Sequence, residues 1–476
     1  MTRRRMLLIL ANATAVSAFV WYAARARDVP KVATGFVANV LCSETFVSGL
    51  DPERTFAETT AAMPGVDLIR WALDYKVDRT GKDVTVTLAG FGRSHAVYRD
   101  ELGCVLEHGE AMADAGAIVD TPEQPPRLPD IAGPSVVAPQ SPQLAATLDR
   151  AFAEPSHPPL KDTRAVVIVK DGRIIAERYA EGFGIDTPVL SFSVAKSVIS
   201  ALAGILVRQG KLALDQPAPV ATWRDPRDPR HAITINHLLR HTAGLALGSS
   251  LQASLGAAFE PVNHMKFMER DMAAFAERAE LETAPGSAWN YHDGNYLILS
   301  RLIQDSVGGT PADMLRFART QLFGPLGMRD VTIEFDGAGT PEGSTQMLAS
   351  ARDWARFGQL YLDGGVAGGN RILQKGWVNY SASPTPNAFI GYGAGFWTNR
   401  GDSLGAHYRI EHGWPRDAFF AKGSIGQYVI VIPSERLVIV RLGRTVNWPL
   451  DVDGVSQLVS DVIAATHGDK RLPGGI

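Results

Sequence analysis

Two residues in the middle of the chain have the chemistry of a nucleophile and its base. Ser193 and Lys196 lie in the segment SFSVAKSVISALAGILVRQGK, which is apolar on nearly every side from residue 193 to 208. The apolar run favours a buried helix that stops at Gly210. The spacing of Ser193 and Lys196 places the hydroxyl and the amine on one side of that helix. Burial favours a neutral lysine, which can take the serine proton and activate the hydroxyl for acyl transfer. The alternative is an N-capping serine beside a lysine that extends to solvent.

A second group of polar residues follows in WNYHDGNYLILSRLIQ. Tyr291 lies in a loop before a helix that is expected to start near Asn295. A tyrosine needs a nearby cation to lower its pKa before it acts as a base, and Lys196 can supply one. Asp293 is placed to hydrogen-bond a substrate amide or to hold the lysine. A tyrosine before a helix is ordinarily a packing residue, so this pattern indicates a catalytic role only in combination with Ser193.

A third group is AFFAKGSIGQYVIV, where small residues precede a strand. Gly423 and Gly426 allow close approach of the backbone, and a free N–H group there can face a carbonyl oxygen. The alternative is a β-bulge that contains glycine. The segment is therefore a candidate oxyanion-binding turn.

The elements that must position these residues are strands at both ends of a long unit, residues 144–476. AVVIVKDGRIIAERYA has two apolar runs around Asp171 and Gly172, which is a strong hairpin signal. QYVIVIPSERLVIVRLG repeats the pattern with a turn at 433–435, and a helix with one apolar side follows. The middle of the unit, about 196–355, is mostly helical. We predict the α+β class: one antiparallel sheet completed by the C-terminus, flanked by helices, with a helical subdomain.

The first third of the chain predicts a separate small unit. Residues 27–120 read as an α+β domain of unknown role, with a hairpin around Thr80 and Gly81. Residues 121–143 are proline-rich, which excludes a helix interior or a central strand. This stretch is a linker, or an extended strap along the next domain.

The N-terminus predicts export. Three arginines at 3–5 precede an apolar run from residue 6 to 24, and Ala24-Arg25-Ala26 resembles a cleavage site. Residues 1–26 are therefore a signal peptide, or an uncleaved membrane anchor because the run approaches the length of a bilayer span. The remaining alternative is a buried N-terminal helix. The protein is expected to be periplasmic, or attached to the membrane by this segment.

Composition and cysteine content limit which ligands and covalent links the protein is expected to have. The 476 residues carry a net charge of −3 without a basic stripe, which argues against nucleic-acid binding. The two cysteines, Cys42 and Cys104, would form a disulfide in an oxidising compartment and two separate buried thiols in a reducing one. A metal site needs more ligands than these, and no histidine cluster accompanies them. We expect no metal and no cofactor.

In this order the three groups resemble the serine β-lactamase and penicillin-binding-protein superfamily. The likeness is greatest to class C-type β-lactamases, related esterases and 6-aminohexanoate-dimer hydrolases. Ser193 to Lys196 match the S-x-x-K motif, and Tyr291 to Asp293 match Y-x-N or Y-x-S. LLRHTAGL, ASARDWARFGQLYLDGG and PRDAFFAKGSIGQ are also similar to the family, so the resemblance covers about residues 145–466.

The resemblance implies an acyl-serine mechanism on a β-lactamase-like fold. Ser193 attacks, Lys196 and Tyr291 shuttle the proton, backbone N–H groups of Ser193 and Ser424 hold the oxyanion, and water releases the acyl group. Gly423 and Asp293 are then substrate-binding positions.

The chain also departs from the family pattern. Ala421 stands where the family's third motif begins with lysine or histidine, and Lys422 lies one position later, on the other face of the strand. Asp293 adds a negative charge where the family has asparagine or serine. His241 in RHTAGL resembles a structural landmark of the family more than an acid–base group.

These patterns favour a serine hydrolase that cleaves a small amide or ester, with linear substrates favoured over β-lactams by Ala421. The alternative is a non-hydrolytic sensor or binding domain that becomes acylated and signals through the N-terminal segment. A transferase would use the same acyl-serine and differ only in its acceptor.

Overall fold

The computed structural model describes residues 28–63, 65–110, 112, 115–116, 125–157, 160–251, 255–445 and 454–468. The predicted signal or anchor at 1–26 lies outside these residues. Within the described ranges, none of the helices has the length and apolar character that a membrane span requires.

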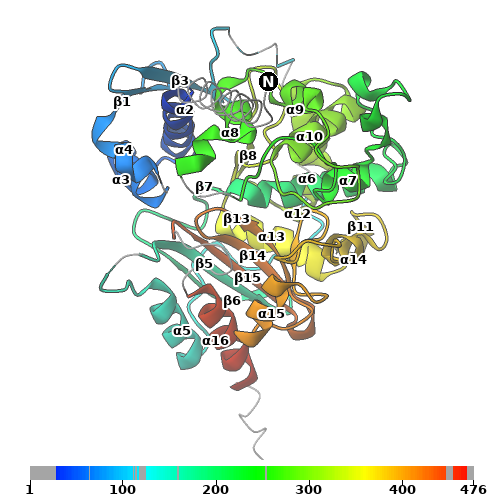
Figure 1. Cartoon of the computed structure of the whole chain (residues 1–476). Helices are drawn as coiled ribbons and strands as arrows, with labels where there is room; N and C mark the ends of the chain where they lie inside the picture. The colour runs from blue at the N-terminus through cyan, green and yellow to red at the C-terminus, as the bar shows by residue number, and fades with distance from the viewer. Residues whose placement is uncertain are drawn as a thin grey trace, which may run out of the picture.

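A six-stranded antiparallel sheet forms the centre of the larger unit, in the lower half of Figure 1. Its order is β12-β13-β14-β15-β5-β6, and the C-terminal strand β15 pairs with β5. This confirms the predicted sheet closed by the C-terminus, with hairpins at Asp171 and at 433–435. The strands are β5 (Thr163–Lys170), β6 (Arg173–Tyr179), β12 (Trp397–Thr398), β13 (Phe419–Gly423), β14 (Gln427–Ile432) and β15 (Leu437–Gly443).

Helices cover both faces of this sheet, which explains why its strands are apolar at nearly every position. Val429 and Val431 of β14 point into the core formed with α6 (Ala195–Arg208) and α13 (Ala351–Leu362). Ile430, between them, points to the opposite core with α5 (Pro142–Phe152) and α16 (Val455–Gly468). The side chains thus alternate between two buried faces.

A helical region lies above the sheet in Figure 1 and is inserted between β6 and β12. A second sheet has the order β7-β9-β8, and its strand Val189–Leu190 leads directly into the Ser193 segment. The remaining elements are β7 (Val189–Leu190), η3 (Phe192–Val194), η4 (Ala221–Trp223), η5 (Pro229–Ala232), α7 (Ile235–Leu239), η6 (Leu255–Phe259), α8 (Pro261–Met268), α9 (Met272–Arg278), α10 (Gly294–Val307), α11 (Pro311–Ala318), η7 (Arg319–Phe323), α12 (Gly324–Leu326), β8 (Val331–Ile333), β9 (Met347–Ala349), β10 (Val366–Ala367), β11 (Asn370–Arg371), α14 (Trp377–Ala382), α15 (Leu404–Glu411) and η8 (Pro433–Glu435).

The N-terminal unit is a four-stranded antiparallel meander with a helix across it, seen at the upper left of Figure 1. The predicted hairpin around Thr80 and Gly81 joins its first two strands. A disulfide between Cys42 and Cys104 links the end of α2 to β4, which confirms the predicted pairing. The elements are α2 (Val29–Cys42), η1 (Ser43–Val47), α3 (Pro52–Ala62), α4 (Val66–Ile69), η2 (Arg70–Ala72), β1 (Leu73–Asp78), β2 (Asp83–Leu88), β3 (Gly92–Arg99) and β4 (Gly103–Leu106).

Two kinds of contact fasten the N-terminal unit to the rest of the molecule. Phe267 of α8 completes the apolar core between α2 and the meander. The buried carboxylate of Glu44 pairs with the guanidinium groups of Arg164 and Arg444, which come from β5 and the end of β15. The unit is therefore packed against the larger one, while the domain boundaries near 120 and 143 stay a prediction.

The described part of the proline-rich stretch is an extended strap along the larger unit. Leu128 and Ile131 are buried in the main core. The backbone of β6 donates hydrogen bonds to the strap, from Ile174 to the carbonyl of Ile131 (2.9 Å) and from Glu177 to that of Val137 (3.1 Å). The strap thus covers the outer edge of the sheet.

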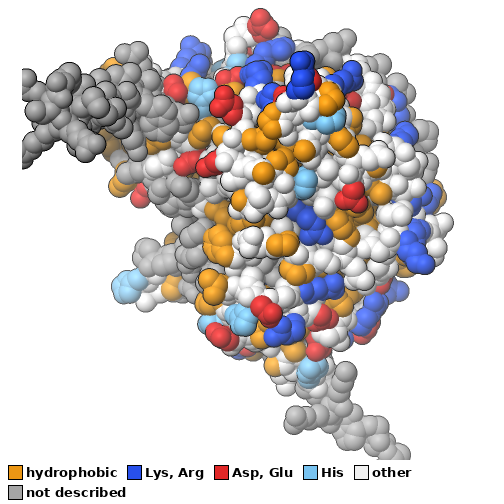
Figure 2. Space-filling view, turned by 45° about the vertical axis from the view of Figure 1, so that its right-hand side comes forward, with side chains coloured by type: hydrophobic (Ala, Val, Ile, Leu, Met, Phe, Trp, Pro, Cys, Tyr) orange, Lys and Arg blue, Asp and Glu red, His pale blue; other side chains and the backbone are white. Residues whose placement is uncertain are grey.

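Basic and acidic side chains are interspersed over the described part of the face drawn in Figure 2. Such a distribution gives that face no large field of one sign.

Candidate functional site

Ser193 lies at the entrance of the buried helix α6. A short turn, η3, precedes the helix, and within it Phe192 takes a φ of 47°, a backbone conformation that is unusual for a bulky residue. Phe192 and Val194 are buried, whereas Ser193 between them is half-buried. A strained residue beside a reachable hydroxyl is typical of a functional site.

Lys196 is buried, and its amine makes three hydrogen bonds. The Nζ atom donates to Ser193 Oγ at 3.0 Å, to Asp293 Oδ1 at 2.6 Å and to the carbonyl oxygen of Ser344 at 2.8 Å. These three bonds use the three hydrogens of an ammonium group. The structure thus places the amine between the candidate nucleophile and a carboxylate.

The charge of Lys196 corrects one sequence-based expectation. Burial lowers the pKa of Lys196, as predicted, but Asp293 and Tyr291 together outweigh burial and leave that pKa above its ordinary value. The prediction of a resting lysine kept neutral by its surroundings is therefore wrong. Burial alone favours the neutral amine, whereas a buried ion pair at 2.6 Å favours the cation.

Tyr291 is the third member of this group. Its ring centroid lies 5.0 Å from Lys196 Nζ, and the side chain is buried. Burial raises the pKa of Tyr291, while Lys196 and a hydrogen bond with Ser193 oppose this rise. His241 and Trp397 pack against its ring, with centroids 4.3 and 5.4 Å away. The phenol is therefore held beside the amine and the hydroxyl.

Asp293 is buried and stands at the N-cap of α10. Of the two possibilities read from the sequence, the structure has this residue hold the lysine. A second cation, Lys266, lies 3.3 Å from Asp293 Oδ2. Burial raises the pKa of Asp293, but the two ammonium groups hold it well below its usual range. The carboxylate therefore bridges two lysines.

The turn after β13 lies beside the Ser193 segment. A Cβ atom on Gly423 would lie 2.1 Å from the carbonyl oxygen of Ser191, so only glycine permits this approach. Ser424, the next residue, is exposed, and Ile425 has a φ of 52°. The structure thus brings the predicted oxyanion turn against the backbone that precedes Ser193.

Alternation along β13 separates Ala421 from Lys422. Ala421 is buried in the main core. The Lys422 ammonium lies over the rings of Trp397 and Tyr428, at 5.9 and 5.5 Å from their centroids. The two residues face opposite sides of the strand, as expected from their spacing.

His241 is buried and acts through packing and a hydrogen bond. Its Nδ1 atom lies 3.1 Å from Asn295 Nδ2. Burial holds the pKa of His241 well below its ordinary value, so the ring is neutral. This arrangement fits the structural landmark inferred from RHTAGL.

Sequence reasoning missed Lys266. It lies in α8 between Met265 and Phe267, which are both buried. A lysine flanked by two large apolar residues was the one available signal. Its partner Asp293 lies 27 residues further along the chain, so the pairing is visible only in the folded structure.

Comparison with known proteins places this geometry in a family. The Beta-lactamase family model matches residues 162–461, which include Ser193, Lys196 and Tyr291. The chain belongs to the Beta-lactamase family.

Two curated proteins are similar to this chain in sequence. The 6-aminohexanoate-dimer hydrolase of Paenarthrobacter ureafaciens is 26% identical over 231 residues, which is 45% of this chain and 56% of that protein. Esterase EstB of Burkholderia gladioli is 31% identical over 212 residues, which is 39% of this chain and 51% of that esterase. The chain thus spans about half the length of these relatives.

A solved structure supports the fold. A penicillin-binding-protein homologue from Caulobacter crescentus superposes with a TM-score of 0.53 at 20% identity, over 71% of this chain and 100% of that one. This likeness confirms the predicted β-lactamase-like α+β architecture.

Proposed function

We propose that this Beta-lactamase family member is a serine hydrolase that cleaves an amide or ester bond through an acyl-serine intermediate. The observation that supports this most directly is the contact between Ser193 Oγ and Lys196 Nζ at 3.0 Å, with Tyr291 packed beside both. The hydroxyl is half-buried while the two proton-carrying groups are buried. Such a nucleophile and base within hydrogen-bond reach are what acyl transfer requires.

The proton of Ser193 is taken by the Tyr291–Lys196 pair. Lys196 is a cation at rest, so the reactive form is the one in which the pair has lost one proton. In that form the phenol and the amine share the remaining proton, because two interacting groups titrate as a unit. Deprotonation at higher pH therefore activates the enzyme.

The chemistry then follows in two steps. Ser193 Oγ bonds to the substrate carbonyl carbon, the pair takes the hydroxyl proton, and the N–H groups of Ser193 and Ser424 stabilise the oxyanion. The pair returns this proton to the leaving alcohol or amine as its bond to the carbonyl carbon breaks. A water molecule then attacks the acyl-serine, and its proton passes through the pair back to Ser193 Oγ as the acid leaves.

Small linear esters and amides with an apolar group are the substrates that the surroundings favour. Ala421 offers no charge for a substrate carboxylate at the position where the family has lysine or histidine. Trp289 packs near Tyr291, with ring centroids 6.3 Å apart, and contacts the half-exposed Phe389 at 5.7 Å. Aromatic side chains at the edge of a site favour apolar groups.

The test combines covalent labelling with turnover. The full chain and a Ser193→Ala variant are treated with a fluorophosphonate, and adducts are measured by intact mass. We expect one adduct on the wild type and none on the variant, together with turnover of p-nitrophenyl esters in preference to a chromogenic cephalosporin. Equal labelling of both proteins contradicts the proposal, and an adduct without any turnover supports the acylated sensor instead.

We also propose that the protein is exported. The Cys42–Cys104 disulfide supports this, because such bonds persist in oxidising compartments. The apolar run at 6–24 behind three arginines supports it further, as a cleaved leader or as an anchor. Cell fractionation followed by intact-mass measurement distinguishes the two, and a full-length protein found only in the cytosol contradicts export.

A further inference from the structure

Two buried lysines share one carboxylate behind the candidate nucleophile. Asp293 Oδ1 lies 2.6 Å from Lys196 Nζ, and Asp293 Oδ2 lies 3.3 Å from Lys266 Nζ. The side chain of Lys266 is 10% exposed and that of Asp293 is 5% exposed. Among the described residues, Asp293 is the group that contacts both Lys266 and Lys196, so it links Lys266 to the candidate catalytic group.

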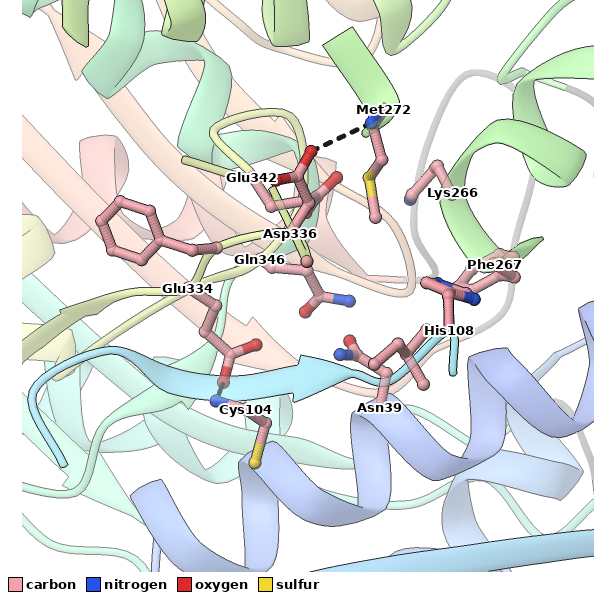
Figure 3. Close-up of a pocket in the computed structure, with 13 residues that line it drawn as sticks. Asn39, Cys104, His108, Lys266, Phe267, Met272, Glu334, Asp336, Glu342 and Gln346 are labelled. Carbon is pink, nitrogen blue, oxygen red and sulfur yellow. Dashed lines mark hydrogen bonds between the residues drawn. The ribbon is translucent and has the colours of Figure 1, made fainter. Parts of the chain in front are cut away.

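Lys266 also lines a small cavity together with residues of the N-terminal unit, among them Asn39 and His108. Figure 3 shows its side chain leaving α8 towards the group formed by Asp336 and Glu342. The cavity has a volume of about 20 Å³, which is room for a water molecule but not for a substrate. Lys266 therefore stands between the candidate catalytic group and a small polar interior space.

The helix that carries Lys266 packs against the N-terminal unit through the neighbouring residue, Phe267. A Cβ atom on Gly35 of α2 would lie 2.9 Å from Cβ of Phe267, so the two helices are in close contact. Phe36 packs edge-on against the Phe267 ring, with centroids 5.9 Å apart. The helix that carries Lys266 is thus supported from outside the region that matches the family.

We propose that Lys266 is a positioning residue for acyl transfer, which limits how tightly Asp293 holds the proton of the Tyr291–Lys196 pair. The proposal rests on the proposed function of Ser193. Without Lys266, the Asp293 carboxylate would pair with Lys196 alone and would stabilise the ammonium form of Lys196 more strongly. A second cation on the other carboxylate oxygen weakens that stabilisation, so the reactive form is reached at lower pH.

Other titratable groups lie around Lys266 and Asp293, and none of them is changed in the variants described below. They are His241, His292 and Tyr296 on the side of Tyr291, and His108, Glu334, Asp336 and Glu342 around the cavity. Burial lowers the pKa of the three histidines, that of His292 to about 4. Burial raises the pKa of Tyr296 and of the three acids, to about 7 for Asp336 and about 8 for Glu334. Because both acids titrate within the assay range, each variant is compared with the wild type over the whole pH range.

The experiment measures kcat/KM for a p-nitrophenyl ester from pH 5 to 9 with the full chain. The variants are Lys266→Met, which keeps the length and removes the charge, and Lys266→Arg, which keeps the charge. Lys375→Met is the matched control, because that lysine is exposed. Lys266→Gln replaces the methionine variant if the latter does not fold by circular dichroism.

In the pH profile of kcat/KM, we expect the ascending limb of Lys266→Met to lie at higher pH than that of the wild type. At a pH on that limb kcat/KM should be about tenfold lower, and at high pH it should approach the wild-type plateau. Lys266→Arg should return the limb towards that of the wild type, and Lys375→Met should not move it. A uniform loss at every pH, or an arginine variant that behaves like the methionine variant, overturns the proposal. A wild type whose rate is no higher than that of Ser193→Ala instead overturns the proposed function.

Discussion

Replacing Asp293 by asparagine tests how the site is charged. Asp293 Oδ1 lies 2.6 Å from Lys196 Nζ, and the two side chains are 5% and 1% exposed. At an effective dielectric constant of about 20, two charges at this separation attract each other by about 6 kcal/mol. Asparagine keeps an oxygen that accepts a hydrogen bond from Lys196 but removes the charge, so only part of this energy is lost.

The sign of the effect follows from the two pKa values that Asp293 influences. Its negative charge raises the pKa of both Lys196 and Tyr291. Without that charge the pair loses its proton at lower pH, and the ascending limb of kcat/KM moves to lower pH. A net change of only about 1.4 kcal/mol, a fraction of the Coulomb energy, gives tenfold higher activity at a pH on the wild-type limb.

The assay is the pH profile of ester hydrolysis, with folding checked by circular dichroism at each pH. Asp74→Asn is the matched control, because Asp74 is exposed on β1 of the N-terminal unit. A limb that stays in place or moves to higher pH in Asp293→Asn would refute the coupling between this carboxylate and the pair. An equal shift in Asp74→Asn would attribute the effect to net charge.

Three further predictions concern stability. Glu44→Gln leaves the buried Arg444 without a paired carboxylate, while Arg164 keeps Glu58, so we expect a loss of about 3 to 5 kcal/mol, measured as a lower denaturant midpoint. An unchanged midpoint contradicts this. Replacing both Cys42 and Cys104 by serine opens a loop of 62 residues, with an expected loss of about 4 kcal/mol in the same assay and no effect of reductant on the variant. Burial raises the pKa of Glu334 from 4.5 to about 8, so its stabilising contribution is complete below pH 4.5 and is lost as the pH rises through 8. Glu334→Gln should therefore lose less thermal stability than the wild type between pH 5 and 9, and parallel losses would argue against it.

Local patterns in the sequence predicted much of the fold. The hairpins at Asp171 and at Thr80 follow from short turns between apolar runs, a signal that depends on few neighbours. The closure of the sheet by the C-terminal strand followed from strands at both ends of one unit. Ser193 and Lys196 were found because one turn of a helix relates them, so their contact is local.

The charge of the site could not be read in the same way. Asp293 is 97 residues from Lys196, and Lys266 comes from another helix, so their ion pairs exist only after folding. Burial of Lys196 was predicted correctly, yet the conclusion drawn from it had the wrong sign, because the sequence left open whether Asp293 holds the lysine or a substrate amide. The support of α8 by the N-terminal unit left no pattern in the sequence.

The packing of α2 has a practical consequence for anyone who trims the gene. The family match begins at residue 162, and an expression clone cut there would lack the helix that shares an apolar cluster with Phe192. Phe267 would lose its apolar partners in α2 and the meander, and Arg164 and Arg444 would lose the carboxylate of Glu44. Such a fragment would be prone to precipitate, so the hydrolase is best produced with its amino-terminal third attached.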